Sequence, residues 1–158
     1  MGKQHQYSLT TTWTGNQGSG TSGYRAYERS HTLSIQNKPD IQGSSDPSFR
    51  GDATKHNPEE LLLASLSSCH MLSYLHLCAD AGVVVTAYID NATGIMEETP
   101  NGSGHFVSAT LYPTVTITDA SMIDKANELH HKANELCFIA NSCNFPVHHE
   151  SKCITDNA

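Results

Sequence analysis

The run from Asn57 to His70 is the feature that most constrains the fold of this chain. It reads Asn-Pro-Glu-Glu-Leu-Leu-Leu-Ala-Ser-Leu-Ser-Ser-Cys-His. Asparagine is a good helix N-cap, proline suits the first helical position, and acidic residues favour the positive end of the helix dipole. Gly82 is a natural stop, so the sequence predicts a helix over 58–81, about 36 Å long. Because its first two-thirds are small or apolar on nearly every side, we expect it to lie inside the protein and not on its surface.

A second helix is predicted over 120–137, begun by Asp119 or Ser121. Its apolar stripe recurs at spacings of three and four residues, which is the helical period. The stripe consists of Ile123, Ala126, His130, Ala133 and Cys137.

The rest of the chain shows strand patterns. An N-terminal β segment is expected over about 6–50, with strands near 7–14, 24–27 and 31–35 and a loop over 39–47. A long hairpin is expected over about 83–117, and a final strand over about 145–154. The order predicts one domain, 1–158, of α+β class, with antiparallel sheet and two buried helices.

The charge balance narrows the classes of partner. The chain has nine Lys and Arg against sixteen Asp and Glu, a net charge of −7. With no basic cluster, nucleic acid and anionic membrane are not expected as partners. The run from Leu61 to Leu66 is too short to span a bilayer, and the residues after Met1 lead into no apolar stretch. We therefore expect a soluble, cytoplasmic protein.

Five cysteines are present, and structural disulfides are rare in a reducing compartment. Cys69 and Cys137 both fall in line with the apolar stripes of the two predicted helices. Each alone would be read as a small core residue. Two buried helices in one small domain usually pack together, so the two thiols can face each other, which suggests thiol chemistry.

These residues carry a family resemblance. The segment Asn57 to Leu61, with Cys69 ten residues after Glu59, resembles the hallmark of the OsmC/Ohr family, the osmotically inducible and organic hydroperoxide resistance proteins. The segment from His130 to Cys137 is similar to the family's second cysteine helix. The likeness covers roughly residues 6 to 154. It implies an intertwined homodimer, with antiparallel sheets wrapped around two long central helices and active sites at the subunit interface.

The resemblance implies a thiol-dependent peroxidase that defends against oxidative stress. Cys69 would attack an organic hydroperoxide and become a sulfenic acid, and Cys137 would resolve it to a disulfide. A dithiol such as dihydrolipoamide, or a lipoylated protein, would reduce that disulfide. No metal and no prosthetic group is implied. A nearby second thiol fits the chemistry, because a sulfenic acid is otherwise exposed to over-oxidation.

In the family an arginine activates the first cysteine and a glutamate orients that arginine. Glu59 matches the glutamate by its place in the motif, although helix capping is the simpler interpretation of both Glu59 and Glu60. Ten residues of straight helix put Glu59 about 15 Å from Cys69. If the helix is unbroken, the Glu59 that serves a given Cys69 comes from another subunit.

The arginine is where the chain departs from the pattern. The Ohr branch's Gly-Gly-Arg-Asp-Gly-Arg segment is absent. Arg50 is closest in position to the arginine of the OsmC branch, and Arg25 and Arg29 are the other candidates. Residue 138 is also Phe, where the family usually has Pro.

Apolar residues of the two helices would line the substrate pocket and favour alkyl or fatty-acid peroxides over hydrogen peroxide. His70 could assist proton transfer there or be a core histidine. The candidate walls are Leu62, Leu66, His70, Leu72 and Phe138. The remaining cysteines, Cys78, Cys143 and Cys153, match no family cysteine and are interpreted as packing or surface residues, with Cys143 the nearest to a backup resolver.

Two alternatives stay open. Cys69 and His76 are seven residues apart on one helix, as are His130 and Cys137 on the other, and two Cys with two His can make a tetrahedral zinc site. The second alternative is a dimer of the same fold that binds a small ligand or lipid without peroxidase activity, which the missing arginine segment favours.

Overall fold

The computed structural model describes residues 2–155. These residues form two compact units, one ending at Leu61 and the other beginning at Leu62. The elements are α+β, with two α-helices and sheets in which antiparallel pairs predominate. The single domain expected over 1–158 stays a prediction.

The first unit holds one antiparallel sheet in the order β1-β2-β3, made of β1 (Thr10–Trp13), β2 (His31–Ser34) and β3 (Ile41–Gly43). The strand β3 lies where the sequence predicts a loop, so that prediction is wrong over these three residues. The strand β3 pairs with β2 through backbone hydrogen bonds, which form although β3 is short and ends in glycine.

The segment 24–27, predicted as a strand, is instead a turn that the Arg29 side chain holds. Its guanidinium donates hydrogen bonds to the carbonyl oxygens of Tyr27 at 2.6 Å and Tyr24 at 2.8 Å. It also lies 4.1 Å and 4.4 Å from the centres of those two rings. Aromatic residues favour strands, but here Tyr24 and Tyr27 lie in a turn and make cation–π contacts with Arg29.

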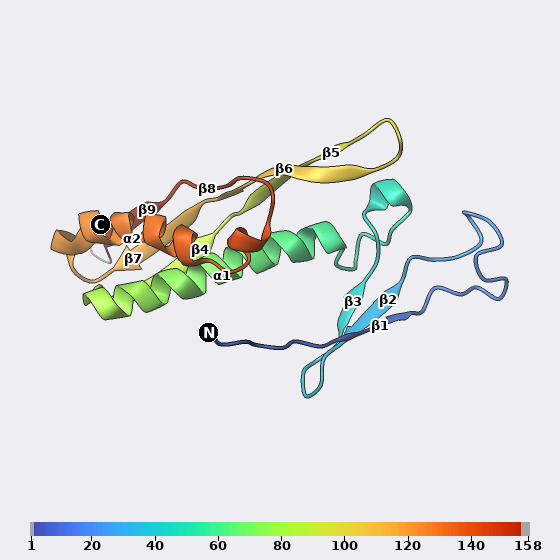
Figure 1. Cartoon of the computed structure of the whole chain (residues 1–158), viewed down its shortest axis with the longest axis horizontal. Coiled ribbons are helices and arrows are strands. Elements are labelled where there is room, and N and C mark those ends of the chain that lie inside the picture. Colours follow the sequence, from blue (N-terminus) through green and yellow to red (C-terminus); the bar gives the residue numbers. More distant parts are fainter. Residues whose placement is uncertain (1, 156–158) are drawn as a thin grey trace. The chain divides into compact units, whose positions relative to one another are not determined.

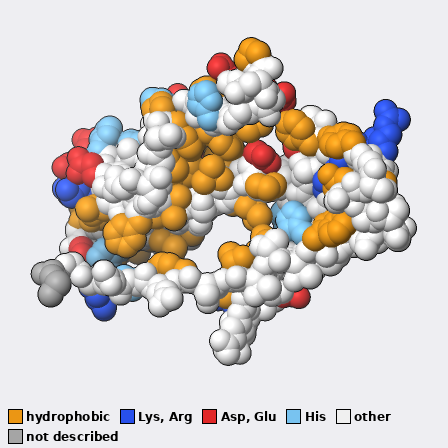
Figure 2. Space-filling view, turned by 45° about the vertical axis from the view of Figure 1, so that its right-hand side comes forward, with side chains coloured by type: hydrophobic (Ala, Val, Ile, Leu, Met, Phe, Trp, Pro, Cys, Tyr) orange, Lys and Arg blue, Asp and Glu red, His pale blue; other side chains and the backbone are white. Residues whose placement is uncertain are grey.

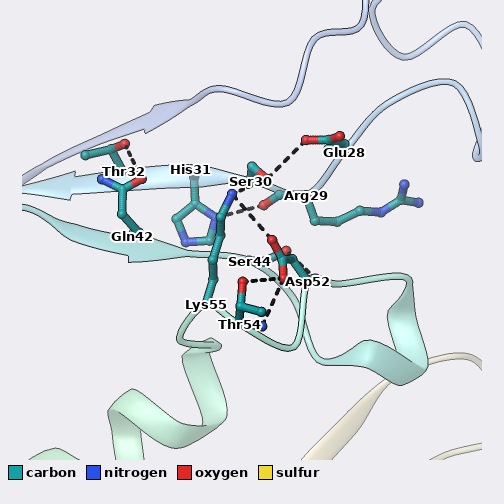
Figure 3. A network of polar contacts seen from close by, with 10 residues as sticks. All are labelled: Glu28, Arg29, Ser30, His31, Thr32, Gln42, Ser44, Asp52, Thr54 and Lys55. Atoms are coloured by element: carbon teal, nitrogen blue, oxygen red, sulfur yellow. Dashed lines mark hydrogen bonds and ion pairs between the residues drawn. The ribbon is translucent and has the colours of Figure 1, made fainter.

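A polar network ties β2 and β3 to the chain that follows (Figure 3). Lys55 Nζ donates a hydrogen bond to Ser30 Oγ at 2.8 Å and lies 3.7 Å from a carboxylate oxygen of Asp52. The buried Ser44 hydroxyl accepts the backbone N–H of Asp52 at 3.0 Å. Between β3 and this loop lies the short 3₁₀ helix η1 (Pro47–Phe49).

The helix α1 spans Pro58–Ala81, where the sequence predicts a helix over 58–81. It ends in a Schellman motif, in which Val83 N–H donates to the Cys78 carbonyl at 2.9 Å and Gly82 N–H to the Ala79 carbonyl at 3.3 Å. Gly82 has φ +74, a conformation that glycine adopts without strain.

The second unit has two mixed three-stranded sheets (Figure 1). Instead of one long hairpin over 83–117, the chain makes β4 (Val85–Asp90) paired with β7 (Pro113–Ile117), and β5 (Thr93–Glu98) paired with β6 (Gly104–Leu111). Asp90 Oδ1 accepts the Tyr112 N–H at 2.7 Å where the two sheets part.

The predicted final strand is also divided, into β8 (Val147–His149) and β9 (Lys152–Thr155). These strands run parallel to β6 and β7 respectively, so the expected antiparallel sheets also contain two parallel pairs. A parallel return needs a crossover connection, which the preceding helix supplies.

The predicted helix over 120–137 begins as the 3₁₀ helix η2 (Ala120–Met122) and continues as α2 (Ile123–Leu136). The Asp119 carboxylate accepts the Ser121 N–H at 2.9 Å at its start. A further 3₁₀ helix, η3 (Ala140–Ser142), follows. The core of this unit joins α1, β7 and α2 and contains Tyr74, Cys78, Val83, Val115, Ile117, Ala126, Leu129 and Ala133.

Only one side of α1 is buried within the chain. The buried residues are four apart and form a single stripe: Leu66, His70, Tyr74 and Cys78. Leu72 is 62% exposed, so the expectation that the helix is enclosed on all sides does not hold for the single chain. By length and composition α1 could cross a membrane, a test that core helices of soluble proteins also pass.

Large hydrophobic side chains reach the surface elsewhere in the second unit as well. Ile89 is 62% exposed and Phe138 is 77% exposed. Figure 2 shows hydrophobic side chains gathered over a broad part of one face. Apolar patches of this kind mark interaction surfaces more often than free surface.

Candidate functional site

The structure brings Cys69 and Cys137 together. Cys69 lies midway along α1 and is partly buried, whereas Cys137 directly follows α2 and is 1% exposed. Both thiols are free, and Cys69 lies close enough to Cys137 to raise the pKa of the Cys137 thiol. The site is therefore a pair of neighbouring free thiols from the two helices, with Cys69 partly exposed and Cys137 enclosed.

The chain after α2 wraps around the Cys137 sulphur. The backbone leaves the helix at Cys137, with φ −69 and ψ 109, and the Ala140 N–H then points back to Sγ at 3.4 Å. Burial, followed by the hydrogen bond with Cys69, raises the pKa of Cys137 to about 11, although the amides of Ala140 and Ile139 oppose the rise. At neutral pH Cys137 keeps its proton and can donate it to the Cys69 sulphur.

A buried pair of histidines also joins α1 to α2. His70 Nε2 and His130 Nδ1 are 3.0 Å apart, and the two ring planes lie within 4° of each other. His70 is 1% exposed and His130 is fully buried. Burial lowers the pKa of His70 to about 4 and that of His130 to about 3. Both imidazoles are therefore neutral at pH 7, and one donates its N–H to the other.

Aromatic rings enclose this histidine pair. The Tyr74 ring stacks on His130 with centres 3.8 Å apart, and His149 of β8 lies 5.6 Å from His70 and 6.0 Å from His130. The outer nitrogens, His70 Nδ1 and His130 Nε2, are buried and have no hydrogen-bond partner among residues 2–155. The sequence did not predict the pair; the signal was a histidine inside each buried stripe.

The two glutamates at the start of α1 have different environments. Glu60 forms a capping box, in which its carboxylate accepts the Asn57 N–H at 3.2 Å and its own N–H donates to Asn57 Oδ1 at 2.8 Å. Glu59 takes no part in the cap, and its Oε2 atom is buried without a hydrogen-bond partner in the described chain. Capping therefore accounts for Glu60 and leaves Glu59 unexplained.

The three candidate arginines all lie in the first unit. Arg29 is committed to the Tyr24–Tyr27 turn. Arg25 is exposed, and so is Arg50, which ends η1 with φ +66. Arg50 and Arg29 line a polar cavity of about 240 Å³ with Glu28, Ser30, Ser44, Gly51 and Asp52.

The residues predicted to line a substrate pocket differ in exposure. Leu66 and His70 are buried in the stripe that faces the core, and Leu62 is partly buried. Leu72 and Phe138 are exposed. Four cavities of the described chain are lined by other residues, and the substrate pocket stays a prediction.

The four residues of the zinc alternative do not form a ligand group. His76 is exposed and pairs with Asp80 at 3.4 Å, while His130 faces His70. Among residues 2–155 there is no group of three or more His, Cys, Asp or Glu side chains placed to hold a metal ion.

The other cysteines lie apart from the dithiol. Cys78 belongs to the core cluster, where burial raises the pKa of its thiol. Cys153 of β9 lines an open cavity of about 680 Å³ beside residues of α2, and burial raises its pKa too. Cys143 follows η3 and is partly buried.

The structure thus places two free thiols, one on α1 and one directly after α2, close together in an α+β fold. The family model described as OsmC-like protein matches residues 51–152. The chain therefore belongs to the OsmC-like family.

Solved structures agree with this assignment. An OsmC-like protein of unknown function from Vibrio cholerae is 30% identical, with a TM-score of 0.84 over 94% of this chain and 99% of that one. An OsmC-like protein from Mycoplasma pneumoniae is 15% identical, with a TM-score of 0.72 over 96% and 99%. An organic hydroperoxide resistance protein from Elizabethkingia anophelis is 16% identical, with a TM-score of 0.64 over 98% and 100%. No curated protein matches the sequence.

Proposed function

We propose that this protein is a thiol-dependent peroxidase that reduces organic hydroperoxides. The observation that carries the proposal is the contact between two free thiols of different character. Cys69 is partly accessible, whereas Cys137 is buried and keeps its proton. Membership of the OsmC-like family, some of whose structural relatives are named organic hydroperoxide resistance proteins, supports the same reaction class.

In the first step the Cys69 thiolate attacks the terminal peroxide oxygen. The O–O bond breaks, a sulphur–oxygen bond forms, and the leaving alkoxide takes a proton to become an alcohol. Cys69 becomes a sulfenic acid. The protonated Cys137 thiol supports an attacking role for Cys69, because the thiolate is the nucleophile and Cys69 is the less buried of the two cysteines.

In the second step the Cys137 sulphur attacks the Cys69 sulphur. A disulfide forms, and the sulfenic oxygen leaves as water with the Cys137 proton. An external dithiol, such as dihydrolipoamide free or on a lipoylated protein, then reduces the disulfide by two exchange steps. The reaction needs no metal or prosthetic group, because the peroxide is the oxidant and the dithiol is the reductant.

Glu59 and Arg50 are the proposed activating residues. Glu59 has a buried carboxylate oxygen without a partner in the described chain, and such an oxygen is costly unless a donor reaches it. An arginine is the donor best matched to a carboxylate, and it would stabilise the Cys69 thiolate. Arg50 is closest in position to the arginine of the OsmC branch, although no contact assigns it.

The protein is proposed to work as a cytoplasmic homodimer. About 15 Å of continuous helix separates Glu59 from the Cys69 of its own chain, so a second copy is needed to bring them together. The exposed Leu72 and Phe138 would then be covered, and could line an apolar pocket with Leu62. That pocket would favour alkyl hydroperoxides. Five free cysteines suit a reducing compartment.

The test is stopped-flow oxidation of the reduced protein by cumene hydroperoxide, with intact mass measured before and after. The wild type should lose about 2 Da as the disulfide forms. Cys137→Ser should accumulate a sulfenic acid that a dimedone probe traps, and Cys69→Ser should not react.

Cys143→Ser is the matched control, because it removes a partly buried thiol outside the pair and should react as the wild type does. Hydrogen peroxide serves as the comparison substrate. No reaction of the wild type with cumene hydroperoxide would refute the peroxidase. A faster reaction with hydrogen peroxide would refute the preference for organic substrates.

A further inference from the structure

We propose that the His70–His130 hydrogen bond is a positioning element that holds α1 and α2 in the alignment in which Cys69 and Cys137 meet. The inference deepens the proposed function, since it concerns the disulfide-forming step of the same site. The histidines act through the helices and do not touch the reacting atoms.

The two contacts lie at different places along the helices. On α1 His70 directly follows Cys69, whereas on α2 His130 precedes Cys137 by seven residues. Seven residues of helix correspond to about 10 Å. The thiol contact and the imidazole contact therefore restrain α2 at two separate points. One contact alone would let α2 pivot about it, but two contacts fix both its distance from α1 and its direction.

The hydrogen bond between the two imidazoles has strict geometric requirements. Both rings are buried, so a nitrogen that loses its partner cannot turn to water. A slide or rotation of α2 would leave the donor and the acceptor both unpaired. An apolar contact tolerates such a slide, because it has no direction. The bond therefore selects one alignment of the helices.

The imidazole rings of His70 and His130 have little freedom to move. Tyr74 stacks on His130, and His149 of β8 lies against both rings. Because Tyr74 of α1 and His149 of β8 lie against the rings, the hydrogen bond transmits position from one helix to the other.

The consequence for the reaction is kinetic. After Cys69 becomes a sulfenic acid, Cys137 must reach it before a second peroxide does, since further oxidation is irreversible. Holding the sulphurs close raises their effective concentration and speeds that step. A chain without the histidine pair should form its disulfide more slowly and should over-oxidise more readily.

The experiment compares two double variants. H70F/H130F keeps two aromatic rings but removes the hydrogen bond. In H70Q/H130N the glutamine amide stands in for Nε2 and the asparagine amide for Nδ1, so a neutral hydrogen bond can form. For each protein the Cys69–Cys137 disulfide is equilibrated against reduced and oxidised dithiothreitol at pH 7, and the effective concentration of the thiol pair is read from the fraction oxidised.

H70F/H130F should lower the effective concentration of the thiol pair by about fivefold or more, which corresponds to the net free energy of one ordinary hydrogen bond. The amide pair should stay within about twofold of the wild type. The two single phenylalanine variants complete a double-mutant cycle and should show coupling. If H70F/H130F does not fold, the amide pair decides alone, since a loss as large as about fivefold there overturns the proposal.

Two results would overturn the positioning role: an unchanged effective concentration in the phenylalanine pair, or an equal loss in both pairs. The measurement contains no peroxide. If the wild type ignores cumene hydroperoxide but the dithiol equilibrium responds as expected, the peroxidase is refuted and the positioning role stands.

Discussion

At the scale of single residues, burial gives the two cysteine thiols different properties and therefore different proposed roles. The thiols lie close enough to affect each other, but only Cys137 is enclosed by the core and by the chain that follows α2. Its raised pKa keeps it a donor to Cys69, so the pair is asymmetric before any peroxide arrives. The adjacent glutamates divide in the same manner, one capping α1 and the other left with an unpartnered oxygen.

The glutamates give the first prediction. Glu59→Gln should slow the oxidation of Cys69 by cumene hydroperoxide by about tenfold or more, because an amide cannot hold an arginine as a carboxylate does. It should change the free energy of unfolding little. The measurement is stopped-flow oxidation beside urea denaturation.

Glu60→Gln is the matched control for Glu59→Gln. It keeps an acceptor for the Asn57 N–H and should leave the oxidation rate unchanged, while Asn57→Ala should lower the free energy of unfolding by about 1 kcal/mol through loss of the cap. Equal rate losses in Glu59→Gln and Glu60→Gln would show that Glu59 has no role of its own.

At the scale of elements, the sequence predicts best where local rules agree. The cap at Asn57 and the stop at Gly82 are local signals, and α1 has the predicted bounds. The break of the long hairpin after Asp90 depends on a hydrogen bond to Tyr112, twenty-two residues away, which no local pattern reveals. The parallel return of β8 and β9 is likewise a tertiary choice.

The candidate site shows the same division. Two thiols in the buried stripes of two helices could be expected to meet, and they do. The histidine pair could not be predicted, because a histidine within an apolar stripe does not reveal its partner sixty residues away. The first unit gave the least reliable predictions, since its tyrosines favour a strand locally but bind Arg29 in a turn.

The end of α1 gives a prediction at this scale. Gly82→Ala should lower the free energy of unfolding by about 1 kcal/mol, because alanine resists the positive φ that the Schellman motif needs. Gly82→Asn should cost less, since asparagine tolerates that conformation. Urea denaturation of the reduced protein measures both. An alanine variant as stable as the asparagine variant would contradict the backbone explanation.

At the scale of the whole molecule, we expect the exposed apolar side of α1 to be covered by another protein surface. A helix that is apolar nearly all round but buried on one side only leaves Leu72 largely exposed. We expect the wild type to sediment as a dimer, and Leu72→Asp to shift it toward monomer. Lys38→Glu, a charge change at an exposed site in the first unit, should not. A monomeric wild type at micromolar concentration would rule out the homodimer.

Acid should destabilise the folded chain through the buried histidines. In the unfolded chain a histidine has a pKa of about 6.5, but burial lowers the pKa of His70 to about 4 and that of His130 to about 3. Between pH 6.5 and pH 4 the unfolded state therefore binds protons that the folded state does not. The free energy of unfolding must fall as the pH falls, by about 2 kcal/mol per histidine between pH 7 and pH 5.

The four carboxylates with a lowered pKa act below this window. The pKa values of Asp46, Asp52, Asp119 and Glu135 are lowered, so their contribution is lost only at still lower pH. Urea denaturation at pH 7, 6 and 5 should show the loss in the wild type and a much flatter profile in H70Q/H130N. The pair titrates as one hydrogen-bonded unit, so His70→Gln alone should also flatten the profile, by about half or more. If the free energy of unfolding falls equally with pH in all three proteins, the acid sensitivity comes from other histidines. The buried pair would then not limit stability below neutral pH.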